Sequence, residues 1–341
     1  MNLIMAGLDH TRADLEVRER FALTKERTAR ALAAIKARGE TGGCVIVSTC
    51  NRTELYASVP EERKFAPARA LCETLGLPFS DYAHYFHEKT DADALEHLCR
   101  VASGLDSRIA GDDQIITQAR EALEFSRTHG CTDCYIETMF RTAIKAAKTI
   151  KTDVVLKTLG IDSVPDETVE KLKTLVPLSG RNAVVIGNGQ MGRLVAERLI
   201  REGTNVTMTL REYKKGVAVI PRSVATIGYG ERYGALAQAD VAVSATASPH
   251  YTLHYDDMVK LPRCPGIIVD LAVPRDVEPS VGNIPGVTLL TVDDIAGKGR
   301  ALPPESLGRI EEILRESIAK YERWRAVKAA GQTVPESGVA T

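Results

Sequence analysis

A glycine-rich turn between a short apolar strand and a helix constrains the fold of this chain more than any other feature. Apolar residues 183–186 are followed at once by a G-x-G-x-x-G turn and then by a helical pattern over residues 193–201. The first glycine permits the turn, the second lets a pyrophosphate approach the backbone, and the third lets the helix pack on the strand. We therefore predict a dinucleotide-binding turn, with phosphates facing the helix N-terminus, made of Gly187, Asn188, Gly189, Gln190, Met191 and Gly192.

Three further apolar runs follow this turn at regular intervals. They cover residues 206–210, 241–244 and 267–270, and helical or loop segments separate them. Strands that alternate with helices in this way form a parallel, doubly wound sheet. The second half of the chain is therefore predicted to be a Rossmann-type domain.

The residue that follows the second strand of this domain indicates which dinucleotide is bound. NAD sites usually place an acid there for the ribose 2′-hydroxyl, whereas NADP sites often place an arginine for the 2′-phosphate. This chain has Arg211, with Lys214 and Lys215 close behind, although Glu212 lies among them. The pattern favours NADPH as the cofactor. The alternative is that these are surface cations on an exposed loop.

The chain of 341 residues is long enough for two domains. Strands alternate with amphipathic helices before residue 150, a glycine interrupts the pattern at Gly160, and Pro303 and Pro304 precede one last helix. We predict an α/β protein with four parts, namely an N-terminal α/β catalytic domain (1–152), a Rossmann-type NADP-binding domain (153–300), a long C-terminal helix (301–330) and a flexible tail (331–341).

Composition excludes several classes of protein. No apolar run approaches the roughly 20 residues that span a bilayer, and no basic segment precedes the first apolar strand, which indicates a cytoplasmic protein without a membrane partner. A net charge of −1 argues against a generally basic nucleic-acid-binding protein. The seven cysteines do not have the regular spacing of a disulfide framework, which indicates that they are reduced thiols. Cys131 and Cys134 have the spacing of a metal-binding pair, but no second pair accompanies them, so no metal site is expected.

A second candidate site lies near the N-terminus, around Cys50. This cysteine follows the apolar run from Cys44 to Val47 and precedes an alternating run, which places it in a tight link between two strands. Arg52 follows two positions later, and a guanidinium both binds carboxylates with two hydrogen bonds and favours a nearby thiolate. Cys50 is therefore a candidate nucleophile, and Thr49, Asn51 and Arg52 are candidates for holding an acidic substrate. The alternative is a cysteine that only fills space, as most cytosolic cysteines do.

The segment Ser48–Tyr56, with the sequence STCNRTELY, resembles the active-site segment of the glutamyl-tRNA reductase family. Segments that resemble the same family recur in order at residues 7–20, 97–107, 184–195 and 269–276. The resemblance implies an NADPH-dependent oxidoreductase that reduces glutamyl-tRNA(Glu) to glutamate-1-semialdehyde, the first step of C5-pathway tetrapyrrole (porphyrin) biosynthesis. It further implies that Cys50 forms a thioester with the glutamyl group, that Arg52 holds the substrate's side-chain carboxylate, and that hydride from NADPH reduces the thioester.

The resemblance also implies roles for residues after the first motif. His97 matches a histidine near the reacting carbonyl, where it would polarise that carbonyl or handle the proton of the leaving group. On the residues alone, a helical histidine among apolar neighbours is as readily a structural one. The family's substrate contacts map onto Ser107, Asp112, Asp113, Gln114 and Gln118.

This chain departs from the family pattern in two places. Gly111–Gln114 reads GDDQ where the family usually has GEPQ, and Arg108 replaces an apolar residue. The family also carries a helical dimerisation domain, and we expect this chain to be a short form without it. The remaining helix has an apolar stripe, which we expect to dock on the chain's own cofactor domain, with a weak homodimer or none. This stripe consists of Leu307, Ile310, Leu314, Ile318, Tyr321 and Trp324.

Glutamyl-tRNA(Glu) is the expected substrate, and the downstream aminomutase is a candidate partner. The candidates for contacts with tRNA are cations along one predicted helix, Arg141, Lys145, Lys148 and Lys151. Two other functions stay open. One is an NADPH-dependent reductase of another activated acyl substrate, which the altered segment at 108–113 favours. The other is a non-catalytic cofactor-binding regulator of tetrapyrrole synthesis, against which the intact Cys50 and Arg52 count.

Overall fold

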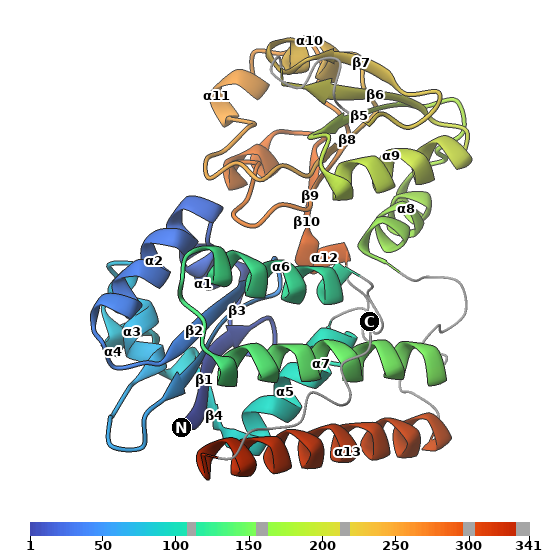
Figure 1. The fold of residues 1–341 in the computed structure, drawn as a ribbon. Coiled ribbons are helices and arrows are strands. Elements are labelled where there is room, and N and C mark those ends of the chain that lie inside the picture. Colours follow the sequence, from blue (N-terminus) through green and yellow to red (C-terminus); the bar gives the residue numbers. More distant parts are fainter. Residues whose placement is uncertain (108–113, 155–162, 212–218, 296–303, 332–341) are drawn as a thin grey trace. The chain divides into compact units, whose positions relative to one another are not determined.

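The computed structural model describes residues 1–107, 114–154, 163–211, 219–295 and 304–331. The chain forms two units (Figure 1). Unit 1 consists of residues 1–158 together with 299–341, and unit 2 consists of residues 159–298. No helix among the described residues is both long and apolar enough to cross a membrane.

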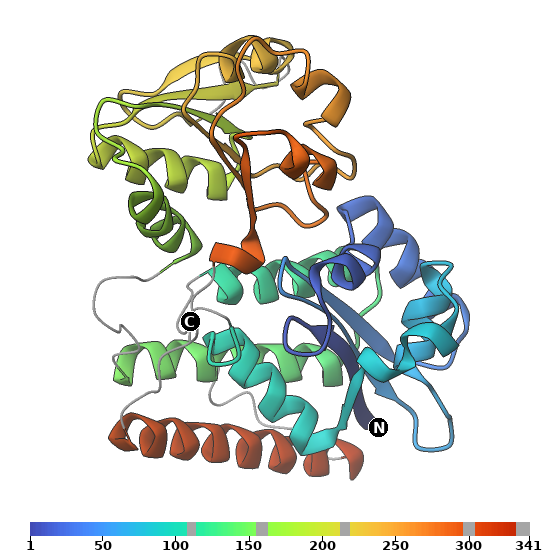
Figure 2. The ribbon, with the colours of Figure 1, turned by 180° about the vertical axis from the view of Figure 1, so that it is seen from behind.

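Unit 1 is built on a four-stranded antiparallel sheet in the order β2-β3-β1-β4. Its strands are β1 (Asn2–Asp9), β2 (Gly43–Ser48), β3 (Arg52–Val59) and β4 (His87–Thr90). Alternation along β1 and β3 directs Met5 and Tyr56, which are cross-strand partners, into one core. The opposite face of the sheet contributes Ala6 and Leu55 to other apolar clusters. Both faces of this sheet therefore contribute to apolar clusters, and Figure 2 shows helices packed around the sheet.

Helices cover both faces of this sheet. Its apolar clusters include residues of α2 and α3 on one side and of α5 and α7 on the other. The helices of unit 1 are α1 (Leu15–Phe21), α2 (Lys25–Ala37), α3 (Pro67–Thr74), α4 (Phe79–Tyr82), α5 (Asp91–Ser103), α6 (Gln114–Thr128), α7 (Cys134–Asp153) and α13 (Pro304–Ala329), with a short 3₁₀ turn at Ala83–Tyr85.

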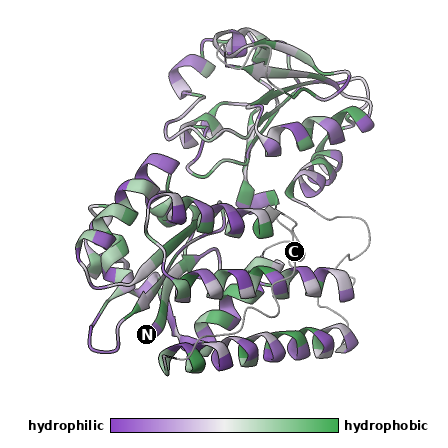
Figure 3. Cartoon of the chain, in the orientation of Figure 1, coloured by the Kyte–Doolittle hydropathy of each residue, from purple (hydrophilic) through white to green (hydrophobic). Residues whose placement is uncertain are grey.

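The last helix, α13, packs against α7 and α5 of unit 1. Ile310, Ile313 and Leu314 are buried in the same core as the sheet, and the hydroxyl of Tyr321 donates to the carbonyl of Tyr135 (3.2 Å). The expectation that this helix docks on the cofactor domain is therefore wrong. The apolar residues of α5 and α7 that face away from the sheet provide the surface it needs. Figure 3 shows hydrophobic and hydrophilic residues alternating along α13.

One residue of the expected stripe does not take part in this packing. Leu307 is 45% exposed, whereas Ile313, which lay outside that stripe, is buried. The buried face therefore begins one turn later than the sequence suggested.

Unit 2 is a six-stranded parallel sheet in the order β10-β9-β8-β5-β6-β7. Numbered within the unit, this is the Rossmann order 3-2-1-4-5-6, which reverses between the first and fourth strands. The strands are β5 (Asn182–Ile186), β6 (Asn205–Leu210), β7 (Ala225–Gly228), β8 (Val241–Ser244), β9 (Ile267–Asp270) and β10 (Thr288–Thr291). The predicted α/β fold with a parallel sheet is confirmed.

The helices of unit 2 are α8 (Val164–Leu175), α9 (Gln190–Arg201), α10 (Arg232–Leu236), α11 (Tyr255–Met258) and α12 (Val292–Ile295), with 3₁₀ turns at Tyr229–Glu231 and Pro279–Asn283. Because β5 and β8 are neighbours at the point where the strand order reverses, their carboxyl ends form the edge where such sheets bind ligands.

Candidate active site

Cys50 lies in the three-residue link between β2 and β3, as predicted, and is half-buried. Backbone contacts hold this link in place. The amide of Thr49 donates to the carbonyl of Arg52 (2.8 Å), and the amide of His10 donates to the carbonyl of Asn51 (2.9 Å). The hydroxyl of Thr49 accepts from the amide of Asn51 (3.2 Å). Thr49 and Asn51 therefore shape the loop that presents Cys50.

Arg18 of α1 makes a further contact with this loop. Its Nη1 donates to the carbonyl of Cys50 (2.7 Å), and the side chain is buried. The sequence reasoning missed this residue, although it lies in one of the segments that resemble the reductase family. The guanidinium thus ties the backbone of Cys50 to α1 and brings a positive charge close to this loop.

Arg52, the first residue of β3, is 2% exposed. Its Nη1 donates to Oε1 of Glu54 (2.8 Å), and its Nη2 donates to the carbonyl of Asp106. Burial lowers the pKa of Arg52, but the charge of Glu54, its hydrogen bond and the charge of Asp9 together outweigh burial and leave the pKa above its usual value. The guanidinium thus stays charged and joins the Cys50 loop to the segment after α5.

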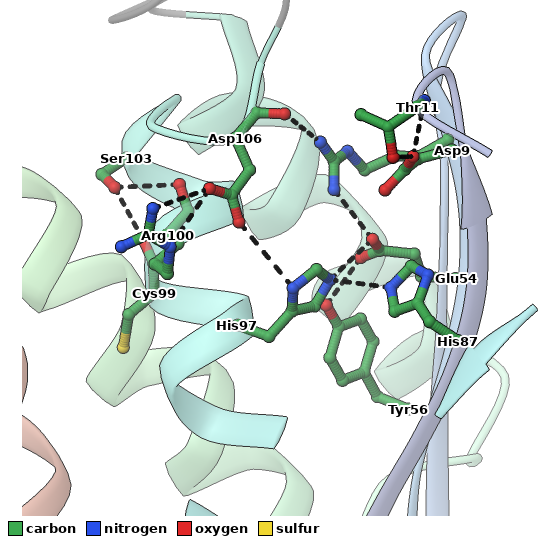
Figure 4. Close-up of polar contacts among 11 residues, drawn as sticks. Asp9, Thr11, Glu54, Tyr56, His87, His97, Cys99, Arg100, Ser103 and Asp106 are labelled. Carbon is green, nitrogen blue, oxygen red and sulfur yellow. Dashed lines mark hydrogen bonds and ion pairs between the residues drawn. The ribbon is translucent and has the colours of Figure 1, made fainter. Parts of the chain in front are cut away.

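Glu54 is the centre of the polar network in unit 1 and is 0% exposed (Figure 4). Its Oε1 lies 2.9 Å from Nε2 of His97, and its Oε2 accepts from the hydroxyl of Tyr56 (2.6 Å). Burial raises the pKa of Glu54, but the neighbouring Arg52 and His97 more than compensate and hold it well below the usual range. Glu54 is therefore an ionised carboxylate inside the protein core.

A glycine on the next strand makes room for this carboxylate. Gly7 of β1 is the cross-strand partner of both Glu54 on β3 and His87 on β4. A Cβ at position 7 would lie 2.5 Å from Cγ of Glu54, which real contacts do not permit. The absence of a side chain at Gly7 therefore lets Glu54 extend across the sheet toward the two histidines.

His97 projects from α5 between Glu54 and Asp106 (Figure 4). Its Nδ1 lies 3.8 Å from Oδ2 of Asp106, and its Nε2 lies 3.5 Å from Nε2 of His87. The imidazole also borders a cavity of about 290 Å³ whose wall is formed by Lys89, Asp93, Glu96, His97, Arg100 and Asp106. A buried imidazole with one edge on a polar cavity can accept or release a proton.

Three of these groups could in principle bind a metal ion. Glu54, His87 and His97 each offer one ligand atom, and these atoms all lie within 4.8 Å of one another. Two imidazoles and a carboxylate would suit zinc. Oε1 of Glu54, however, already lies within hydrogen-bond distance of Arg52 and His97, and a divalent cation there would sit beside a buried guanidinium. The arrangement is better suited to positioning protons than to holding a metal.

The structure describes the predicted substrate-binding residues only in part. Ser107 directly follows Asp106 and is half-buried, and Gln118 is half-buried on α6. Gln114 is the first residue of α6, but its side chain is not described. Asp112 and Asp113 lie outside the described residues.

The glycine turn in unit 2 has the geometry that dinucleotide binding requires. Gly187 has a φ of +104°, and a Cβ there would lie 2.6 Å from the carbonyl oxygen of Ala245. At Gly192 a Cβ would lie 2.1 Å from the carbonyl oxygen of Gly187, so the third glycine lets α9 pack against the turn. The space around Gly189 holds no atom within 4 Å of such a Cβ. The second glycine therefore leaves the approach to the N-terminus of α9 open, as a bound pyrophosphate needs.

Arg211 directly follows β6, as predicted, and its side chain is exposed. Its guanidinium carbon lies 5.8 Å from the centre of the Tyr229 ring. Lys214 and Lys215 lie outside the described residues. Of these three predicted cations, the described part of the chain therefore includes only Arg211.

Two buried carboxylates organise the same edge of the sheet in unit 2. Asp276 accepts from the hydroxyl of Ser244 (2.7 Å) and from the amide of Thr246 (2.7 Å). Asp270 accepts from the amides of Ala272 (3.0 Å) and Val277 (2.8 Å). Burial and the neighbouring Asp276 raise the pKa of Asp270 to about 8. Both acids lie in the segment 269–276, which resembles the reductase family, but the sequence alone does not show that the two carboxyl groups lie close together.

Comparisons with known proteins match both units. Residues 6–154 match the family described as glutamyl-tRNAGlu reductase, N-terminal domain, and residues 169–297 match shikimate / quinate 5-dehydrogenase. The chain is 39% identical over 328 residues to a glutamyl-tRNA reductase of Alkaliphilus oremlandii, which covers 95% of this chain and 97% of the relative. It is 40% identical over 327 residues to one of Acetivibrio thermocellus, with the same coverage.

A solved structure is similar to the chain as well. The glutamyl-tRNA reductase from Methanopyrus kandleri is 28% identical, with 94% of this chain and 79% of that chain covered and a TM-score of 0.48.

Proposed function

The chain belongs to the glutamyl-tRNA reductase family, and from that premise we propose that it reduces the glutamyl group of glutamyl-tRNA to glutamate-1-semialdehyde, using NADPH and a thioester on Cys50. Enzymes of this family are oxidoreductases of tetrapyrrole synthesis. A free carboxylate is a poor hydride acceptor, and esterification to tRNA supplies the activated acyl group that the reduction needs.

Cys50 acts as the nucleophile in this proposal. Its thiolate attacks the ester carbonyl, a C–S bond forms, the C–O bond to the tRNA breaks, and the released 3′-hydroxyl takes up a proton. Arg18 supports this step because its charge lies next to the carbonyl of Cys50. His97 is proposed to supply the proton, since its ring borders a polar cavity, lies within hydrogen-bond distance of Glu54 and faces Asp106 at 3.8 Å.

NADPH, when bound, supplies the hydride that converts the thioester to the aldehyde and returns Cys50 to the thiolate. The chain's own contribution is to hold the cofactor. The turn from Gly187 to Gly192 would bind the pyrophosphate, and Arg211 would bind the 2′-phosphate, which favours NADPH over NADH. An Arg211→Ala variant should reduce the ratio of NADPH affinity to NADH affinity about tenfold, mainly because NADPH binds more weakly.

The substrate's side-chain carboxylate is proposed to bind Arg52. Two of the five N–H groups of this guanidinium donate to Glu54 and Asp106, so the others can donate to a substrate carboxylate without breaking those bonds. Ser107, Gln114 and Gln118 are proposed as further substrate contacts, and Asp112 and Asp113 as partners for the substrate's ammonium group.

A single observation carries this proposal. One chain combines a nucleophile on a rigid loop beside a buried Arg–Glu–His network with a dinucleotide turn whose three glycines have the required geometry. A thiol hydrolase would need only the first of these features, and a cofactor sensor only the second. A reductase that works through a thioester needs both.

The test is incubation with glutamyl-tRNA that carries radiolabelled glutamate. Without NADPH, label should become bound to the wild-type protein, and with NADPH it should appear as semialdehyde. Cys50→Ser should abolish semialdehyde formation but leave NADPH binding unchanged. Cys134→Ser, at an exposed cysteine of α7, is the matched control and should behave as wild type. Full reductase activity in the Cys50→Ser variant would refute the proposed role of the cysteine.

A further inference from the structure

The buried carboxylate of Glu54 has no task in the chemistry of thioester formation and reduction, yet it lies at the centre of the network. It is surrounded by Arg52, His97 and Tyr56, and each of these side chains is itself buried. An ionised carboxylate in a protein core is costly unless every neighbour is arranged for it. Such an arrangement points to a specific role for this residue.

The distances determine how the His97 ring carries its proton. Nε2 lies 2.9 Å from the ionised Oε1 of Glu54, whereas Nδ1 lies 3.8 Å from Asp106, beyond hydrogen-bond length. His87 offers a competing partner to Nε2 at 3.5 Å, but burial and the nearby His97 lower the pKa of His87 and keep its ring neutral. The charged, closer carboxylate is therefore the acceptor, and a neutral His97 has its hydrogen on Nε2.

The fold reserves space for this contact. The Cγ of Glu54 lies only 2.5 Å from the position of a Cβ at residue 7, and Gly7 and Glu54 are direct cross-strand partners. The carboxylate thus reaches His97 only because position 7 of β1 lacks a side chain.

We propose that Glu54 is a positioning residue, which binds Nε2–H of His97 so that Nδ1 is the nitrogen that exchanges protons with the site. The same oxygen orients the Arg52 guanidinium, so one carboxylate sets the geometry of both groups. Nδ1 then faces Asp106 and the polar cavity beside α5. This inference rests on the proposed function, in which His97 supplies a proton during catalysis.

Three variants distinguish a role of Glu54 in orienting His97 from a role in stabilising the fold. In Glu54→Gln, Arg52 and His97 both need an acceptor, so the amide oxygen should face them and the amide nitrogen should face Tyr56, whose hydroxyl can accept. The hydrogen on Nε2 should then remain. Glu54→Leu removes the acceptor, and Gly7→Ala displaces the carboxylate while every polar group stays in the chain. Ser58→Ala is the matched control, because Ser58 is also buried and lies on the same face of β3.

The first measurement is nitrogen NMR of the whole protein labelled at histidine, with His97→Gln to assign the signal. In wild type, Glu54→Gln and Ser58→Ala, the hydrogen of His97 should lie on Nε2. In Glu54→Leu and Gly7→Ala, the two tautomers should mix. A wild-type ring with its hydrogen on Nδ1, or a folded Gly7→Ala variant with an unchanged tautomer, would overturn the inference.

The second measurement is semialdehyde formation. We expect kcat to fall about 100-fold in Glu54→Leu and Gly7→Ala, since general acid–base catalysis contributes at least that factor, and to stay within about tenfold of wild type in Glu54→Gln. If kcat falls equally in Glu54→Gln and Glu54→Leu, although His97 keeps its hydrogen on Nε2 in Glu54→Gln, a role of Glu54 in orienting His97 is contradicted. The NMR measurement needs no substrate, so its result remains valid if the wild-type protein forms no semialdehyde. A lack of semialdehyde would count against the proposed function alone.

Discussion

At the scale of single residues, the loop that carries Cys50 is held by a side chain far from it in sequence. Arg18 belongs to α1, and its guanidinium reaches the carbonyl of Cys50 in the link between β2 and β3. Its charge and its hydrogen bond act on the same three-residue loop. Replacement of Arg18 should therefore change the rate of thioester formation and leave NADPH binding by unit 2 unchanged.

Replacement of Arg18 by Met should slow thioester formation about 10- to 100-fold, because a charge-assisted hydrogen bond contributes about 1.5–3 kcal/mol. The rate at which radiolabelled glutamate becomes bound to the protein, without NADPH, measures this effect. Arg20→Met, at an exposed position of the same helix, is the control and should be nearly neutral. An unchanged rate in the Arg18 variant would show that the loop needs no such support.

The raised pKa of Asp270 predicts a pH dependence of unit 2. The unfolded carboxyl group has a pKa near 4, and the folded one is raised to about 8, first by burial and then by Asp276. Between these values the folded state keeps a proton that the unfolded chain has lost. Stability from this group is therefore complete at low pH and declines as pH rises toward 8, by at most about 1.4 kcal/mol per pH unit.

Calorimetry of the whole protein from pH 5 to 9 should show the unfolding temperature of unit 2 falling as pH rises. Asp270→Asn should flatten this decline, although the variant starts from lower stability because one backbone amide loses its acceptor. A wild-type transition that does not move with pH would contradict the prediction.

The sequence was informative about residues whose position in the fold follows from their immediate neighbours in the chain. Cys50 follows a strand and precedes Arg52, and the three glycines follow one another in a single turn, so both were predictable. Glu54 stands in the same motif as Cys50 but reads there as one residue of an alternating strand. Its partners come from β3, α5 and, across Gly7, β4, and only the folded sheet brings these segments together.

At the scale of elements, apolar periodicity predicted helices and central strands but neither their partners nor the sheet edges. The stripe on α13 showed that one face is buried, without indicating whether unit 1 or unit 2 covers it. β7 and β10 were missed because they are edge strands with hardly any fully buried residue, and so lack the apolar runs that marked β5, β6, β8 and β9.

The docking of α13 can be tested by removing one buried side chain. Ile313→Ala should lower the free energy of unfolding of unit 1 by about 2–5 kcal/mol, the usual cost of such a cavity. Leu307→Ala, at the exposed start of the same helix, should change it by less than about 0.5 kcal/mol. The only tryptophan of the sequence, Trp324, lies on α13 and contacts Tyr135, so its fluorescence in urea reports this unit. Equal effects of the two variants would contradict the observed packing.

At the scale of the whole molecule, the two units differ in how the chain builds them. Unit 2 is one continuous segment, residues 159–298, whereas unit 1 needs segments from both ends of the sequence. Without α13, the core that unites the sheet with α5 and α7 loses four buried side chains, Ile310, Ile313, Leu314 and Tyr321.

Separate expression should reveal this difference. A fragment of residues 159–298 should fold cooperatively and bind NADPH, because its sheet and glycine turn are complete. A fragment of residues 1–158 should unfold at lower urea than unit 1 of the whole chain, and addition of a peptide of residues 299–341 should restore part of its stability. A stable 1–158 fragment that ignores the peptide would show that α13 is dispensable.

The return of α13 to unit 1 also sets the order in which the protein can mature on the ribosome. The unit whose synthesis begins first is completed last, since roughly 150 residues separate the end of α7 from Ile310. At about 5–20 residues per second, the apolar surface of α5 and α7 stays uncovered for roughly ten to thirty seconds. A nascent chain that stalls after unit 2 but before α13 would therefore carry a complete cofactor unit and an incomplete unit 1. Its uncovered apolar surface is of the kind that chaperones of nascent chains shield.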